Sequence, residues 1–179
     1  TSDTSETYRT DSVVLMVEVS DVEDSDEEVT VTIEHMAPQG SWSSSYISSP
    51  WFNSSSQRWQ ANFTPPISAT LGDYDVRVMV TDADDGTSAW STFSDNITVL
   101  NNAPVFQNYA TSADEVLRTS TIVIGVNSTD TEDSETAHTV TIQYRAPSGT
   151  WIASDLSTPW YNSVAGRWES NYTPVAGSK

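Results

Sequence analysis

The sequence contains no cysteine, and its single lysine is Lys179. Without cysteine the chain can form no disulfide framework, and it can carry neither thiol catalysis nor a metal site built on thiolates. Basic residues are scarce, because 7 Lys and Arg stand against 25 Asp and Glu, for a formal net charge of −18. Nucleic acid and anionic membrane surfaces would repel such a chain, so we expect neither as a partner.

Long apolar runs are absent as well. No stretch approaches the ~20 residues needed to span a bilayer, so we expect no membrane insertion. The sequence begins at Thr1 without a signal-like segment, and we interpret it as a fragment of a longer secreted or cell-surface protein. Asn-X-Ser/Thr sequons point weakly in the same direction, at Asn53, Asn62, Asn96, Asn127 and Asn171.

Helical spacing of apolar residues is also missing, whereas alternation is frequent. Apolar residues occupy every second position over 13–19, 29–33 and 74–80, and turn-rich segments such as SSPWFNSSSQ separate these stretches. Several short extended segments without a helix are typical of an antiparallel sandwich or barrel. The sequence therefore predicts an all-β fold.

An internal repeat organises the chain. Residues 9–65 align with residues 118–174 without a gap at an offset of 109 (118 − 9), and roughly half of the positions are identical. For example, SPWFNSSSQRWQANFTP in the first copy aligns with TPWYNSVAGRWESNYTP in the second. Residues 67–117 are found only once. We therefore expect two modules of one type.

The end of the first copy resembles a known family. YDVRVMVTDADDGTSAWSTFSDNITVLNNAPVF is similar to the last strands and the linker of cadherin-type and related immunoglobulin-like extracellular repeats, which recur in microbial surface proteins. The resemblance implies tandem repeats of an immunoglobulin-like antiparallel β-sandwich. We place the first repeat at 1–100, a linker containing Pro104 at 101–107, and a second, C-terminally truncated repeat at 108–179. An alternative boundary joins residues 67–117 to 118–174.

Acidic residues cluster in two predicted loops of the first repeat. One cluster holds Asp21, Glu23, Asp24 and Asp26, and the other holds Asp82, Asp84 and Asp85. Loops after the second and sixth strands of such a sandwich emerge at one end, so these carboxylates could converge on calcium, which takes oxygen ligands. A solvated acidic loop without a metal ion is the alternative.

The family resemblance also implies calcium ligands. Its acidic pair after the second strand falls on Asp21 and Glu23, and in the second copy on Asp130 and Glu132. Thr98 and Asn101 stand where the family linker carries acidic residues, so we expect no full interdomain cluster. A site here would be a weak one of the extracellular class, with Kd about 10⁻⁴ to 10⁻³ M.

Aromatic residues recur between the copies and give a second hypothesis. The set consists of Trp42, Trp51, Phe52 and Trp59, with their counterparts Trp151, Trp160, Tyr161 and Trp168. Exposed aromatic faces stack on sugar rings, but recurrence at one offset is also what a structural core requires. We expect most of them to pack against the fold.

The sequence offers no catalytic constellation. Neither His35 nor His138 belongs to a shared set with a nucleophile and an acid, and no Gly-rich phosphate loop is present. We therefore predict a non-catalytic spacer, stalk or adhesion module that meets protein or glycan at a cell surface. The alternative is a carbohydrate-binding accessory domain of a secreted hydrolase.

The second copy lacks counterparts of residues 74–100. Burial of one apolar side chain stabilises a fold by about 1.5 to 3 kcal/mol, and each missing one removes that contribution. The free energy of unfolding of a typical domain is only about 5 to 15 kcal/mol. We therefore predict that residues 118–179 are mobile in a monomer, or that they take strands from a neighbouring chain along an exposed edge.

Overall fold

The computed structural model describes residue 2 and residues 5–174. The chain divides into two compact units, Thr1–Asn102 (unit 1) and Ala103–Lys179 (unit 2). Strands dominate both units, and the one helical element among the described residues is a 3₁₀ turn, η1, at Glu135–Ala137. The prediction of an all-β fold is therefore confirmed. No helix in the described part is long and apolar enough to cross a membrane.

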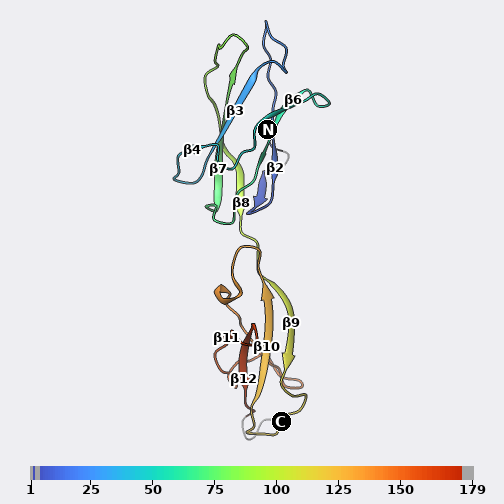
Figure 1. Cartoon of the computed structure of the whole chain (residues 1–179). Coiled ribbons are helices and arrows are strands. Elements are labelled where there is room, and N and C mark those ends of the chain that lie inside the picture. Colours follow the sequence, from blue (N-terminus) through green and yellow to red (C-terminus); the bar gives the residue numbers. More distant parts are fainter. Residues whose placement is uncertain (1, 3–4, 175–179) are drawn as a thin grey trace. The chain divides into compact units, whose positions relative to one another are not determined.

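Unit 1 is built from two sheets that face each other (Figure 1). The larger sheet has the strand order β1-β8-β7-β3-β4, and the smaller has the order β2-β6-β5. The strands are β1 (Glu6–Tyr8), β2 (Val13–Val17), β3 (Thr30–Met36), β4 (Trp42–Ser43), β5 (Trp51–Asn53), β6 (Arg58–Phe63), β7 (Gly72–Thr81) and β8 (Ser91–Leu100).

The core of unit 1 fills the space between these sheets. Side chains alternate across a strand, so every second residue of β2, β3 and β7 points inward. The buried apolar residues are Val13, Leu15, Val29, Val31, Ile33, Ala61, Phe63, Ala69, Tyr74, Val76, Val78, Ile97 and Val99. The alternating stretches of the sequence thus supply much of this core.

Strand pairing identifies unit 1 as an immunoglobulin-like sandwich. β3, β7 and β8 pair antiparallel in one layer, and β2, β6 and β5 pair antiparallel in the other. β1 runs parallel to β8, with Glu6 opposite Thr98. The Tyr74 hydroxyl donates to the Thr70 carbonyl oxygen at 2.8 Å. This bond corresponds to the tyrosine corner, which immunoglobulin-like sandwiches form near the start of the equivalent strand. The predicted immunoglobulin-like β-sandwich is therefore confirmed for unit 1.

The described residues of unit 2 form one four-stranded sheet with the order β11-β12-β10-β9. Its strands are β9 (Val105–Thr111), β10 (Ile122–Thr129), β11 (Trp160–Asn162) and β12 (Arg167–Tyr172). The register of β10 on β12 matches that of β2 on β6, because Ile122 lies opposite Tyr172 as Val13 lies opposite Phe63. Homologous segments of the two units therefore form the same ladder.

Residues 139–145 depart from the expected strand. The alternation of Val140, Ile142 and Tyr144 predicts a strand like β3, but only Tyr144 forms a bridge, to Ile152. In unit 1, β3 pairs with β7 along its whole length, whereas the described residues of unit 2 include no strand in the position of β7. An extended segment without a neighbouring ladder is not held as a strand.

Apolar side chains are poorly covered in unit 2. The large exposed ones are Val105, Phe106, Tyr109, Leu117, Trp151, Ile152, Trp160 and Val164. The prediction that residues 118–179 are mobile or take strands from another chain stays a prediction, and residues 175–179 lie outside the described part.

The division between the units follows Asn102. Residues 105–107, which the sequence assigns to a linker, are the first three residues of β9. They join unit 2 because β9 pairs antiparallel with β10, with Val105 opposite Thr129.

Candidate functional site

The acidic loops of unit 1 are organised by hydrogen bonds to their own backbone. Asp21 Oδ1 accepts from the amides of Glu23 at 2.8 Å and Asp24 at 3.0 Å. These bonds, with that from Asp24 the larger influence, hold the pKa of Asp21 below its usual range. Asp82 Oδ1 accepts in the same way from Asp84 at 2.9 Å and from Gly86 at 2.7 Å. Both loops are thus closed by a carboxylate near their start.

The two acidic loops lie close together, as the sequence predicts. The amide of Ala83 donates to Asp24 Oδ2 at 3.1 Å, and this bond joins the loop after β2 to the loop after β7. Within the described residues, however, no three or more His, Asp or Glu side chains are grouped so that they could hold a metal ion. One carboxylate oxygen each of Asp21, Asp24 and Asp82 accepts from backbone amides. Calcium binding by Asp21, Glu23, Asp24, Asp26, Asp82, Asp84 and Asp85 stays a prediction.

Unit 2 repeats the first of these loop closures. Asp130 Oδ1 accepts from the amides of Glu132 at 2.7 Å and Asp133 at 3.0 Å. These bonds, with that from Glu132 first, hold the pKa of Asp130 below its ordinary value. His138 Nδ1 lies 2.7 Å from Ser128 Oγ, and His138 is buried where unit 1 has Val29. Calcium binding at Asp130 and Glu132 likewise stays a prediction.

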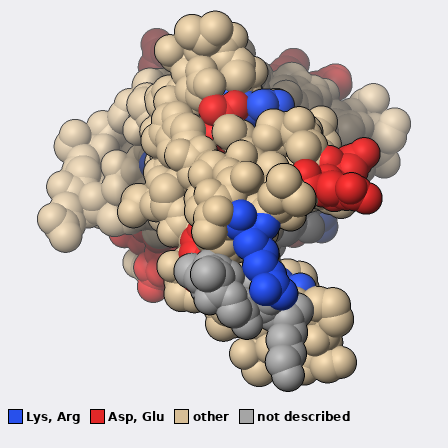
Figure 2. Space-filling model, turned by 90° about the horizontal axis from the view of Figure 1, so that it is seen from below, with Lys and Arg blue, Asp and Glu red and all other residues tan. Residues whose placement is uncertain are grey.

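Acidic residues dominate the charge of the protein, because 25 Asp and Glu stand against 7 Lys and Arg. On the face drawn in Figure 2, acidic side chains lie in several separate groups, and basic side chains are fewer. Ion pairs use some of the basic residues, as between Arg58 and Glu18 and between Arg77 and Glu34.

Arg77 forms a cation–π stack that sequence reasoning missed. Its guanidinium lies 4.5 Å from the ring centroid of Trp42 and 4.1 Å from that of Trp90. It also donates from Nε to Glu34 Oε2 at 2.7 Å, across the β3–β7 ladder. Only long-range pairing brings these residues together, so no local motif reveals the stack. Trp42 thus has a structural role.

The remaining recurrent aromatic residues divide into anchors and exposed rings. Trp59 donates from its indole N–H to the Asp26 carbonyl oxygen at 2.7 Å, and Trp168 donates to that of Glu135 at 2.8 Å. Each Trp therefore holds the segment that follows β2 in unit 1 or β10 in unit 2. Trp51 and Trp160, by contrast, are both 38% exposed, and Trp151 is 59% exposed. Phe52 and Tyr161 pack against the anchor rings, with centroids 6.0 Å and 5.8 Å apart.

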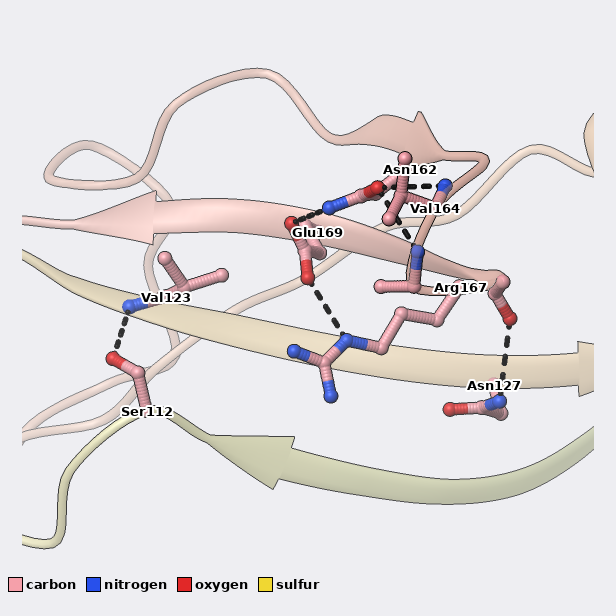
Figure 3. Close-up of polar contacts among 9 residues, drawn as sticks. Ser112, Val123, Asn127, Asn162, Val164, Arg167 and Glu169 are labelled. Carbon is pink, nitrogen blue, oxygen red and sulfur yellow. Dashed lines mark hydrogen bonds and ion pairs between the residues drawn. The ribbon is translucent and has the colours of Figure 1, made fainter.

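A polar cluster on β11 and β12, next to β10, holds the most buried carboxylate among the described residues of unit 2 (Figure 3). Glu169 is 6% exposed and accepts from Asn162 Nδ2 at 2.8 Å and from Arg167 Nε at 2.9 Å. The bond from Asn162, followed by that from Arg167, holds the pKa of Glu169 below its usual value. Arg167 lies across Gly125, where an added Cβ would come within 2.6 Å of its Nε. A side chain at Gly125 would therefore displace the guanidinium.

The equivalent residues of unit 1 have different ion-pair and hydrogen-bond partners. Arg58 pairs with Glu18, which belongs to the segment after β2, and Met16 occupies the place of Gly125. Gln60 stands in the place of Glu169 and accepts from Asn53 at 3.1 Å. The sequence predicts only that each Arg meets an aromatic ring or a carboxylate. Which carboxylate it meets depends on the neighbouring strand.

Comparisons with known proteins give the fold little further context. No protein-family model matches the chain. No curated protein matches it either. Among solved structures, that of the titin domains Z1Z2 in complex with telethonin is 15% identical, with a TM-score of 0.42, and covers 96% of this chain and 77% of that chain. The immunoglobulin-like assignment of unit 1 rests on its own strand pairing.

Proposed function

We propose that this chain is a non-catalytic structural module of a secreted or cell-surface protein, a spacer or stalk unit that also offers surfaces for adhesion. The observation that carries this proposal is the parallel pairing of β1 with β8. These are the first and last strands of unit 1. A force that pulls the two ends of unit 1 apart loads a parallel pair of terminal strands in shear, so that its hydrogen bonds must break together.

Hydrogen bonds flank this pair at both ends. The amide of Thr98 donates to the Ser5 carbonyl oxygen at 2.8 Å, and the amide of Arg9 donates to that of Leu100 at 3.1 Å. The Arg9 side chain adds a bond from Nε to the Ala69 carbonyl oxygen at 2.8 Å. The start of unit 1 is therefore fastened to its end, as a load-bearing spacer requires.

Single-molecule pulling of the full chain between its ends tests this function. We expect a force peak whose released contour length matches unit 1. Thr98→Pro removes the amide that donates to Ser5 and is expected to lower that force. Thr98→Val is the matched control, because both variants lose the 2.6 Å bond from the Thr98 hydroxyl to Asp73, but Val keeps the amide. Equal forces for the wild type and Thr98→Pro would contradict the proposal.

We propose that the module is cadherin-like in its use, with a protein or glycan partner at a cell surface and with calcium stiffening the acidic loops. The resemblance of residues 74–106 to such repeats and the hydrogen bond between the two acidic loops support this. A titration with calcium that follows the melting temperature of unit 1 tests the stiffening.

A carbohydrate-binding accessory module is the second candidate. Trp51 and Trp160 occupy equivalent positions and are equally exposed, and exposed indole faces can stack on sugar rings. A glycan array with the wild type and the double variant Trp51→Ala/Trp160→Ala tests it. Binding that the double variant loses would favour this candidate, and a blank array would leave only the structural role.

A further inference from the structure

The outer face of the unit 2 sheet carries an aromatic ring and a cation at neighbouring positions. Trp160 on β11 lies opposite Glu169 on β12, and Arg167 is two residues from Glu169 on the same strand, so all three side chains project to one face of the sheet. Diagonal neighbours such as Trp160 and Arg167 lie about 7 to 8 Å apart. Trp160 is 38% exposed, and the side chain of Arg167 is 31% exposed. Both groups are therefore open to solvent.

The equivalent ring in unit 1 shows that this exposure belongs to the outer face. Trp51 is the counterpart of Trp160 and is also 38% exposed, although two facing sheets enclose the core of unit 1. Phe52, the next residue, turns inward instead and packs against Trp59. The exposure of Trp160 therefore follows from its place on the outer face of its sheet and not from an uncovered core.

Glu169 fixes the direction of the Arg167 guanidinium. Arg167 Nε donates to Glu169 Oε1 at 2.9 Å, while Glu169 Oε2 accepts from Asn162 Nδ2 at 2.8 Å. The guanidinium lies across Gly125, which has no side chain to displace it. Figure 3 shows the terminal nitrogens, Nη1 and Nη2, without a hydrogen bond, and within the part of the chain that the structure describes neither has a partner. Glu169 thus holds a cation in place and leaves its outer donors unused.

Unit 1 carries the same types of residue without this arrangement. Arg58 directs both Nε and Nη2 to Glu18, which stands where unit 2 has Asn127, and Met16 fills the place of Gly125. Among the described residues, only unit 2 therefore keeps both terminal nitrogens of this arginine available beside the exposed indole.

The two groups suit an uncharged sugar. Glu169 already balances the charge of Arg167, and the net charge of −18 opposes an anionic ligand. A purely apolar ligand would cover the terminal nitrogens without accepting their hydrogen bonds, and this costs free energy. A neutral sugar ring has a C–H face that stacks on an indole, and hydroxyl oxygens at its edge that accept hydrogen bonds. Such a ligand meets both groups at once.

We propose that Trp160 and Arg167 form a binding site for an uncharged sugar residue of a glycan on the outer face of unit 2. The sugar ring stacks on the Trp160 indole, and its hydroxyl oxygens accept from the terminal nitrogens of Arg167. Glu169 is a positioning residue, because both of its oxygens are already occupied and it is only 6% exposed. This inference rests on the second candidate function, carbohydrate binding, and assigns it to one unit.

An array of uncharged oligosaccharides of glucose, galactose, mannose and xylose, with sulfated and uronic-acid oligosaccharides beside them, tests the site in the full chain. We expect binding to uncharged members, and the strongest binder is then titrated against the variants. Trp160→Ala and Arg167→Lys should each weaken binding about tenfold or more, because one removes the stacking surface and the other removes the paired donors. Arg58→Lys is the matched control in unit 1 and should bind as the wild type does. Preference for the sulfated or uronic-acid members would overturn the proposal.

A triple variant separates the site from the fold. Gly125→Met/Asn127→Glu/Glu169→Gln keeps Trp160 and Arg167 but gives the guanidinium the surroundings that it has in unit 1, so this variant should fold and lose binding. Amide spectra that match the wild type outside β10 and β12 confirm the fold. Binding retained by the triple variant would overturn the proposal.

Two outcomes distinguish this site from the carbohydrate candidate as a whole. Binding that Trp51→Ala removes and Trp160→Ala leaves intact would place the site in unit 1, which overturns the inference and keeps the candidate. A wild-type chain that binds no oligosaccharide would overturn both, whereas the pulling experiment would still decide the spacer function.

Discussion

His35 stacks on Tyr46 in the core of unit 1, with ring centroids 4.5 Å apart and planes inclined by 16°. The same two positions of unit 2 hold Tyr144 and Asp155, which are joined by a hydrogen bond from the tyrosine hydroxyl. That bond raises the pKa of Tyr144 to about 12. One pair of positions therefore supports a ring stack in the closed sandwich and a polar bond in the open sheet.

Unit 1 is expected to lose stability in mild acid because of His35. The residue is 3% exposed, and neither ring nitrogen has a hydrogen-bond partner among the described residues, so burial lowers its pKa below 6.5. Neutral His35 therefore contributes stability fully above about pH 6.5, and this contribution is lost as the pH falls below that value. One proton sets a limit of about 1.4 kcal/mol per pH unit on its share of the loss.

Urea unfolding between pH 7.5 and 5, read from amide exchange of β3 and β7, measures this loss. His35→Phe keeps an aromatic ring beside Tyr46 and should remove most of the dependence. His138→Gln, in unit 2, is the control and should leave the acid response of unit 1 unchanged. An unaltered slope in His35→Phe would show that another group is responsible.

Gly125→Met is expected to break the polar cluster of unit 2. The new side chain would push Arg167 away from Glu169, so the pKa of Glu169 should rise, as NMR titration can measure. Adding Asn127→Glu and Glu169→Gln reproduces the arrangement of Glu18 and Gln60 in unit 1 and should recover stability. A Glu169 pKa that does not change in the single variant would contradict this account.

Arg77→Ala should destabilise unit 1 by about 2 kcal/mol, since it removes a stack on two indole rings and a partly buried ion pair. Arg77→Lys keeps the charge but loses the planar stacking, so we expect an intermediate loss. Trp42→Ala in the Arg77→Ala background should cost less than it does alone. Additive losses in this double-mutant cycle would mean that the two residues do not interact.

Calcium is expected to raise the melting temperature of unit 1. With Kd about 1 mM, 10 mM calcium would add about 1.4 kcal/mol to stability. Asp21→Asn and Asp82→Asn should abolish the rise, and sodium chloride of equal ionic strength is the control for screening. A melting temperature that calcium leaves unmoved would leave the acidic loops with backbone closure as their role.

Residues 139–145 should exchange their amide hydrogens much faster than residues 30–36, because only Tyr144 and Ile152 bridge in that part of unit 2. A peptide of residues 72–100, which carries the β7 and β8 sequences, is expected to slow that exchange by pairing along this edge. A peptide with the same composition in scrambled order is the control. Slow exchange in the free chain at micromolar concentration would contradict both mobility and strand uptake, provided that sedimentation shows a monomer.

Local pattern was enough to predict β2, β3 and β7 of unit 1 and much of its core. It was wrong for SSPWFNSSSQ, which was predicted to be a turn but contains β5, because β5 is held as a strand by its pairing with β6. Val13 and Leu15, like Val76 and Val78, alternate in the sequence and are buried in the structure. Successive side chains of a strand point to opposite faces, so the apolar positions of such a stretch identify its buried face. The position of the two acidic loops at one end also followed, since the order of strands in such a sandwich fixes where its loops emerge.

The sequence by itself determined which residues can form strands and that two homologous stretches share one pattern. Only the tertiary structure decided whether a strand forms, because a ladder needs a partner distant in the sequence: TVTIEHM pairs as β3, whereas the similar TVTIQYR does not. The same holds for Arg77 between Trp42 and Trp90, and for the two partners of Arg58 and Arg167. Such contacts depend on strand register and on neighbouring strands, which no local pattern encodes.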